Sequence, residues 1–99
     1  MLKGLGGMGD MMGLMKQAQK MKKDMKKLKK EISKTNITVS DKNNMLTVVM
    51  NGDHVLQKIN FSNDFEFSNI KNIEALIKDV VNKASKEVDK MSSDKMSVL

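Results

Sequence analysis

Hydrophobic residues near the start of the chain recur at spacings of three and four positions. They are Met11, Leu14, Ala18, Met21, Met25, Leu28 and Ile32. This spacing is the a/d pattern of a heptad repeat, and it predicts a helix with one narrow apolar seam. Asp10 is the predicted N-cap of this helix. Four glycines among residues 1–9 predict a flexible arm before it.

The middle of the chain has the alternating pattern of strands. Apolar residues alternate with polar ones over residues 36–40, and Met45–Met50 is a second apolar run. A third strand is predicted over His54–Phe61. Asn51-Gly52 precedes it and predicts a two-residue type I′ turn, in which both residues have positive φ. These features predict a three-stranded antiparallel meander whose apolar face needs a cover.

A helical apolar stripe returns after residue 69, with Ser68 or Asn69 as the predicted cap. Its members are Ile70, Ile73, Leu76, Ile77, Val80, Val81, Ala84, Val88 and Met91. The wide first part of the stripe is suited to cover a sheet. The narrow later part, from Ala84 to Met91, is typical of a helix–helix seam. Residues 92–99 are predicted to be a loose tail.

The predicted fold class is therefore α+β, with the order α-β-β-β-α and two long flanking helices. One domain over residues 10–91 lies between the arm of residues 1–9 and the tail of residues 92–99. At 99 residues and 11.1 kDa, such a chain buries too little of its apolar surface alone, which predicts a homodimer. The heptad seam also needs a partner, either the last helix of the same chain or the first helix of a second copy. If two copies of the first helix pair, basic e and acidic g positions suit a parallel pair. Pairing with Ala84, Val88 and Met91 of the last helix is equally possible, and simpler.

Composition excludes most catalytic and metal chemistry. The chain has no Cys and one His, which excludes disulfides, thiolate zinc sites and cysteine nucleophiles. The carboxylates form no pair with a base, so we expect no enzyme, cofactor, metal or small-molecule substrate. Met8, Met11, Met12 and Met15 could suggest a thioether copper site, but methionines at helical spacing are more typical of a core or of an adaptable contact surface. No apolar run is long enough to cross a bilayer, and the N-terminus has no apolar leader, so no membrane partner and a cytoplasmic protein are expected.

Charge is concentrated in the first third of the chain. Residues 1–34 hold ten lysines and three acids, whereas residues 35–99 hold eight lysines and nine acids. In the heptad frame the lysines fall at b, c, e and f, so that many lie four residues from another lysine and repel it. A bound polyanion would relieve this repulsion, and nucleic-acid phosphate is the main candidate. The alternative is a lysine face that is only solvated.

The kind of basic residue indicates how a polyanion would be held. The chain has no Arg, Trp or Tyr, so it has few groups suited to read base edges or to stack on bases. Lysine–phosphate contacts remain, which predicts weak sequence preference on duplex DNA and steep salt dependence. The other hypothesis is a protein–protein adaptor that uses the methionine-rich seam as a docking groove.

Several short segments resemble one known family. They are the Gly/Met-rich start, Leu14-Met15-Lys16-Gln17-Ala18-Gln19-Lys20-Met21, Met50-Asn51-Gly52, Ile73-Glu74-Ala75-Leu76 and Val81-Asn82-Lys83-Ala84. The chain thereby resembles the YbaB/EbfC family of nucleoid-associated proteins through about residue 96.

The resemblance implies a tweezer-shaped homodimer with a shared sheet body and helical arms. It also implies DNA binding in the nucleoid, with effects on chromosome organisation and transcription. The family's DNA contacts are attributed to the first and last helices. The matching residues here are Lys16, Lys20, Lys23, Lys27 and Lys30, followed by Lys83, Lys86 and Lys90.

Overall fold

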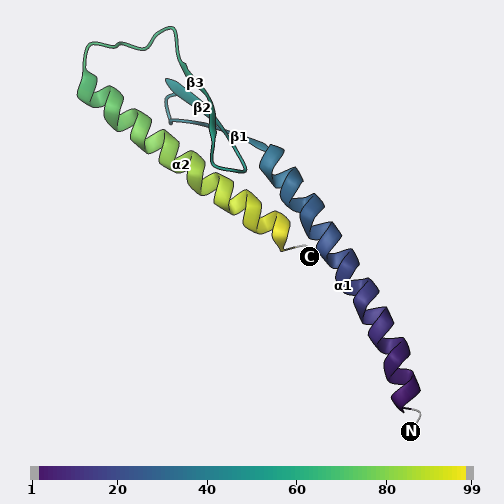
Figure 1. Cartoon of the computed structure of the whole chain (residues 1–99). Coiled ribbons are helices and arrows are strands. Elements are labelled where there is room, and N and C mark those ends of the chain that lie inside the picture. The colour runs from purple at the N-terminus through teal and green to yellow at the C-terminus, as the bar shows by residue number, and fades with distance from the viewer. Residues whose placement is uncertain (1–2, 98–99) are drawn as a thin grey trace. The chain divides into compact units, whose positions relative to one another are not determined.

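The computed structural model describes residues 3–97, with side chains from residue 11 onward. Its five elements follow the predicted order, which confirms the α-β-β-β-α fold (Figure 1). They are α1 (Lys3–Lys34), β1 (Asn36–Ser40), β2 (Leu46–Asn51), β3 (Leu56–Phe61) and α2 (Ile70–Met96). The chain forms two compact units, Met1–Lys30 and Glu31–Leu99.

The first helix is longer than predicted. It begins at Lys3, so Asp10 lies inside α1 and is not its cap. Each interior glycine costs about 1 kcal/mol of helix stability relative to alanine. A helix that is already nucleated, however, gains one hydrogen bond for every further residue, and here it continues through the glycine-rich segment. The flexible arm and the domain boundaries stay predictions.

The three strands form the predicted antiparallel meander, in the order β1-β2-β3. Val39 pairs with Val48, and Val48 pairs with Ile59 on the other side. Paired residues point to the same face of a sheet, so these three side chains share one apolar face. The pairing of β2 with β3 shifts between Val49 and Met50, which brings Met50 opposite Leu56.

Helix α2 covers this face over β1 and β2, as Figure 1 shows. The core consists of Val39, Leu46, Val48, Met50, Val80, Ala84 and Val88. Ala84 and Val88 are fully buried, so the later part of α2 packs on the sheet as well. The prediction that this part of the helix packs against another helix is therefore wrong. It packs against the strands, because the small Ala84 side chain lets the helix approach them closely. Each buried valine contributes roughly 1.5–3 kcal/mol.

The ends of α2 agree with the sequence only in part. The Asn69 side chain caps the helix as predicted, because its Oδ1 accepts a hydrogen bond from the Asn72 backbone N–H at 3.2 Å. The helix then continues to Met96, beyond the predicted end near Met91. Ahead of the cap, Phe61, Phe65 and Phe67 pack in tilted and edge-to-face arrangements, with ring centroids 4.8–5.1 Å apart. This aromatic cluster ties the connection to the end of β3.

The turn between β2 and β3 differs from the prediction. No glycine in the part of the chain that the structure describes has positive φ, whereas His54 has a φ of 63°. The His54 N–H donates to the Asn51 carbonyl at 3.0 Å, and the Asn51 N–H donates to the Val55 carbonyl at 3.0 Å. Residues 52–54 thus form a three-residue loop whose last residue, His54, has a left-handed backbone, and the predicted type I′ turn is wrong. β3 begins at Leu56, two residues later than predicted.

Gly52 is required in this turn for a reason that lies elsewhere in the chain. A Cβ at this position would lie 1.8 Å from the backbone oxygen of Ile32, in the last turns of α1. The neighbouring Asp53 carboxylate accepts a hydrogen bond from the Ser33 hydroxyl. The turn thus packs against the end of α1, where Ile32 is buried.

Candidate nucleic-acid interface

The strongest concentration of charge in the structure lies on α1. Between residues 11 and 30 the helix carries eight lysines and a single acid, Asp24. All eight lysines are exposed: Lys16, Lys20, Lys22, Lys23, Lys26, Lys27, Lys29 and Lys30. The helical period places the lysines at b, c and f on the side opposite the apolar seam, whereas Lys22 and Lys29, at e, lie beside the seam.

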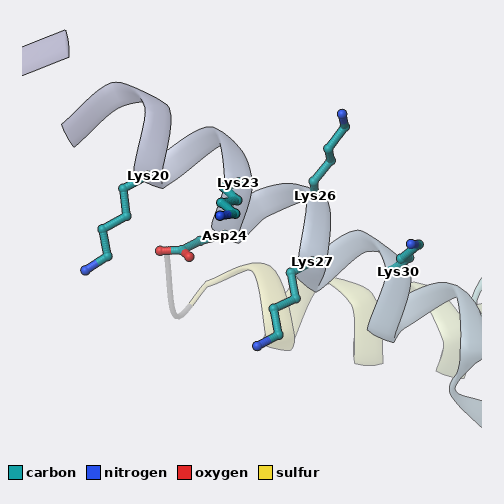
Figure 2. Close-up of a pocket in the computed structure, with 6 residues that line it drawn as sticks. All are labelled: Lys20, Lys23, Asp24, Lys26, Lys27 and Lys30. Atoms are coloured by element: carbon teal, nitrogen blue, oxygen red, sulfur yellow. The ribbon is translucent and has the colours of Figure 1, made fainter. Parts of the chain in front are cut away.

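None of these lysines forms an ion pair with another described side chain. Among residues 11–97, the one close contact between a basic and an acidic side chain joins His54 Nε2 and Asp89 Oδ1 at 2.7 Å. Figure 2 shows Lys20 and Lys27 extended to one side of the helix and Lys26 to another. The α1 lysines therefore present uncompensated positive charge to the solvent.

The lysines of α2 lie in a different electrostatic setting. Residues 70–96 hold six lysines and five acids, so this helix has almost no net charge. Lys83 lines a shallow hollow together with Asp41 and Asp79. Lys90 lines another with Glu87 and Asp94. Lys83, Lys86 and Lys90 are exposed, and the carboxylates that share a hollow with Lys83 and with Lys90 weaken the attraction of these two lysines for an anion.

The residue set implied by the family resemblance leaves out three lysines of α1. Lys22, Lys26 and Lys29 are exposed like the five that it includes. Their heptad positions, b and e, could have identified them from the sequence. The cationic surface of α1 thus contains eight lysines, and within one rigid helix Lys16 and Lys30 lie about 21 Å apart along the axis.

Comparison with known proteins identifies the family. The chain matches the YbaB/EbfC DNA-binding family over residues 8–99. The chain belongs to this family. Two of its relatives carry the name nucleoid-associated protein. The one from Hahella chejuensis is 35% identical over 92 residues, which cover 93% of this chain and 82% of the relative.

The second YbaB/EbfC relative comes from Legionella pneumophila strain Corby. It is 31% identical over 86 residues, which cover 87% of this chain and 77% of the relative. Family membership confirms the resemblance inferred from the sequence.

The described part of this YbaB/EbfC chain offers little to other kinds of site. No group of three or more His, Cys, Asp or Glu side chains there is placed to hold a metal ion. No described helix combines the length and the apolar character that a membrane span requires.

Proposed function

We propose that this protein binds duplex DNA in the bacterial nucleoid, chiefly through contacts of α1 lysines with backbone phosphates. The observation that carries the proposal is the set of eight exposed lysines on α1, none of them ion-paired within the described residues. Bound phosphates would stabilise this surface, because their negative charge offsets the repulsion between neighbouring ammonium groups. The family and the names of its relatives support DNA as the partner and the nucleoid as the location.

The mode of binding follows from the chemistry of lysine. Lysine is a flexible point charge and does not present the two-pronged donor geometry with which arginine reads guanine. We therefore propose little sequence preference, and an influence on gene expression through the organisation of DNA rather than through recognition of operators. The lysines from Lys16 to Lys30 extend over about 21 Å of helix, which is roughly two thirds of the length of one turn of duplex DNA.

We further propose that the protein acts as a homodimer that uses β3. Leu56 and Ile59 lie on the apolar face of the sheet but are 37% and 43% exposed, because α2 packs over β1 and β2. Their neighbours Met50 and Val48 on β2 are buried. β3 is also an edge strand with free backbone groups, which a second copy could pair with or cover.

The lysine assignment is tested with a triple variant, Lys16→Gln, Lys23→Gln and Lys30→Gln. These f positions face away from the seam, so the fold should be unaffected. If each lysine neutralises one phosphate, the slope of log affinity against log salt becomes less steep by about 2.7, since each contact contributes about 0.9. A gel-shift titration at several ionic strengths, on two unrelated duplexes, measures this slope.

The matched control is Lys42→Gln, Lys58→Gln and Lys71→Gln, which removes the same charge from three lysines outside α1. It should leave the slope nearly unchanged. Equal weakening by the two triple variants would show that net charge matters and that α1 does not. Wild-type binding that is insensitive to salt would exclude phosphate contacts altogether.

The dimer is tested separately with Ile59→Lys, which places a charge on the uncovered part of the apolar face. Thr38→Lys is the control, because Thr38 lies on the opposite face of the sheet. Sedimentation equilibrium should give a dimer for the wild type and for Thr38→Lys, and a monomer for Ile59→Lys. A dimer that survives Ile59→Lys would rule out β3 as the interface.

A further inference from the structure

The apolar seam of α1 has no function in phosphate binding. It consists of Met11, Leu14, Ala18, Met21, Met25 and Leu28. Met11, Leu14 and Met21 are 59–63% exposed, and Met25 is 39% exposed. A lysine helix that only binds phosphate would need no regular apolar stripe on its other side. The stripe therefore indicates a second contact made by the same helix.

The chain's other helical stripe is not available to this seam. Ala84 and Val88 of α2 are fully buried against β1 and β2. The sequence left open whether the last helix of the same chain or a second copy of α1 fills the seam. Because α2 uses its apolar stripe within the 31–99 unit, the second copy is the remaining choice.

The charges beside the seam select the direction of pairing. In a parallel pair in register, a g residue faces the e residue of the next heptad on the partner helix. Asp24 at g would then face the second copy's lysine at position 29, and the symmetric contact would form as well. In an antiparallel pair, g faces g and e faces e, which brings acids onto acids and lysines onto lysines. Charge complementarity therefore favours the parallel pair.

The same helix also resists pairing. Each α1 carries eight lysines and one acid between residues 11 and 30. Two such helices side by side repel. Four of the six seam positions hold methionine or alanine, where strong coiled coils have leucine or isoleucine. An anion bound along the outer faces would remove this repulsion and leave the seam free to close. Salt would do the same in part by screening.

We propose that α1 pairs in parallel with α1 of a second copy through its apolar seam, and that duplex DNA promotes this pairing by neutralising the outward lysines. The proposal rests on the proposed function, because DNA is the anion. The coupling is reciprocal: DNA strengthens pairing, and pairing strengthens DNA binding by the same factor. Binding to one duplex is then cooperative, and a pair that contacts two duplexes would bridge them.

The absence of cysteine from the 99 residues allows a direct test in the whole chain. Met21→Cys places a thiol at a d position, where two parallel helices in register bring identical residues within disulfide distance. Gln19→Cys is the control, because this exposed b position is two residues away and points away from the seam. Both variants are oxidised with diamide, with and without a random-sequence duplex, and the cross-linked species is quantified.

We expect duplex DNA to speed cross-linking of Met21→Cys by about tenfold, within the usual range of coupling between sites, and to leave Gln19→Cys slow. High salt without DNA should also speed Met21→Cys. Equal acceleration of both variants would mean that crowding on DNA brings chains together, and the seam proposal would be wrong.

The two proposals can fail separately. A gel shift on the reduced variants reports DNA binding, and cross-linking in high salt reports the seam without DNA. Normal DNA binding with no cross-link at position 21 overturns the pairing and leaves the proposed function intact. Salt-driven cross-linking without any DNA binding overturns the proposed function and the role of DNA in pairing.

Discussion

Replacing Gly52 with alanine tests how the β2–β3 turn holds the end of α1. The new Cβ would lie 1.8 Å from the Ile32 oxygen and 2.5 Å from the Ile32 carbonyl carbon, where ordinary contact begins at 3.4 Å. The two backbones would have to separate by roughly 1.6 Å. The backbone of Gly52 does not have positive φ, so alanine brings no torsional strain of its own.

The cost can be estimated from what this separation breaks. Ile32 is 6% exposed, and returning it to water costs about 1.5–3 kcal/mol. The hydrogen bond from Ser33 to Asp53 contributes about 1 kcal/mol. Alanine also restricts the unfolded chain, which opposes the loss by about 0.4–1 kcal/mol. The expected net decrease in the free energy of unfolding is about 2–3 kcal/mol.

Urea unfolding followed by far-UV circular dichroism measures this decrease. With a slope of about 1–2 kcal/mol per molar urea, the midpoint should fall by roughly 1–3 M. Gly13→Ala is the matched control, because nothing lies within 4 Å of the added Cβ on the exposed helix. That control should gain up to about 1 kcal/mol of local helix stability.

A Gly52→Ala protein that unfolds at the wild-type urea concentration would refute the reasoning. It would mean that the turn moves away from α1 without cost, and that the contact with Ile32 contributes nothing to the fold. A decrease in Gly13→Ala of the same size would show instead that any alanine in place of glycine disturbs the protein.

Two further predictions concern the turn between β1 and β2. Burial alone would raise the pKa of Asp41, but hydrogen bonds from the backbone N–H groups of Leu46, Met45 and Asn43 outweigh it and lower the pKa below 3.8. The ionised Asp41 carboxylate therefore stabilises the fold fully above about pH 4, and this stabilisation is lost as pH falls through the pKa of the folded state. Urea titrations at decreasing pH should show a shrinking difference in the free energy of unfolding between wild type and Asp41→Asn. Asn44 has a φ of 55°, which glycine adopts without the steric cost that a side chain brings. Asn44→Gly should therefore raise the free energy of unfolding by up to about 1 kcal/mol, and with it the thermal midpoint. A lower midpoint would contradict this.

Much of the fold could be predicted because local patterns decide it. The heptad spacing, the strand alternation and the wide stripe after Asn69 each correspond to an element of the structure. The turn at Gly52 could not be predicted, because the glycine is required by Ile32, twenty positions earlier, and no local pattern records that contact. The burial of Ala84 and Val88 could not be predicted for a similar reason: a narrow stripe fits a sheet as well as a helix.

The candidate site was predictable in its chemistry and less so in its extent. Segregation of lysine into the first third of the chain is a property of the sequence, and it is enough to single out α1 as the cationic helix. The contrast with α2 depends on which carboxylates lie near Lys83 and Lys90, and that depends on the packing of the helix on the sheet. Only the folded chain brings Asp41 close to Lys83.

The cover of the core comes from a segment that follows the strands in the chain. A ribosome produces Val39, Leu46 and Val48 before it produces Val80, Ala84 and Val88, which bury them. At about 5–20 residues per second, the apolar face of the nascent sheet stays bare for a few seconds. Folding of this unit therefore waits until α2 has left the exit tunnel. A nascent chain that stalls before α2 emerges would be a substrate for chaperones or proteases.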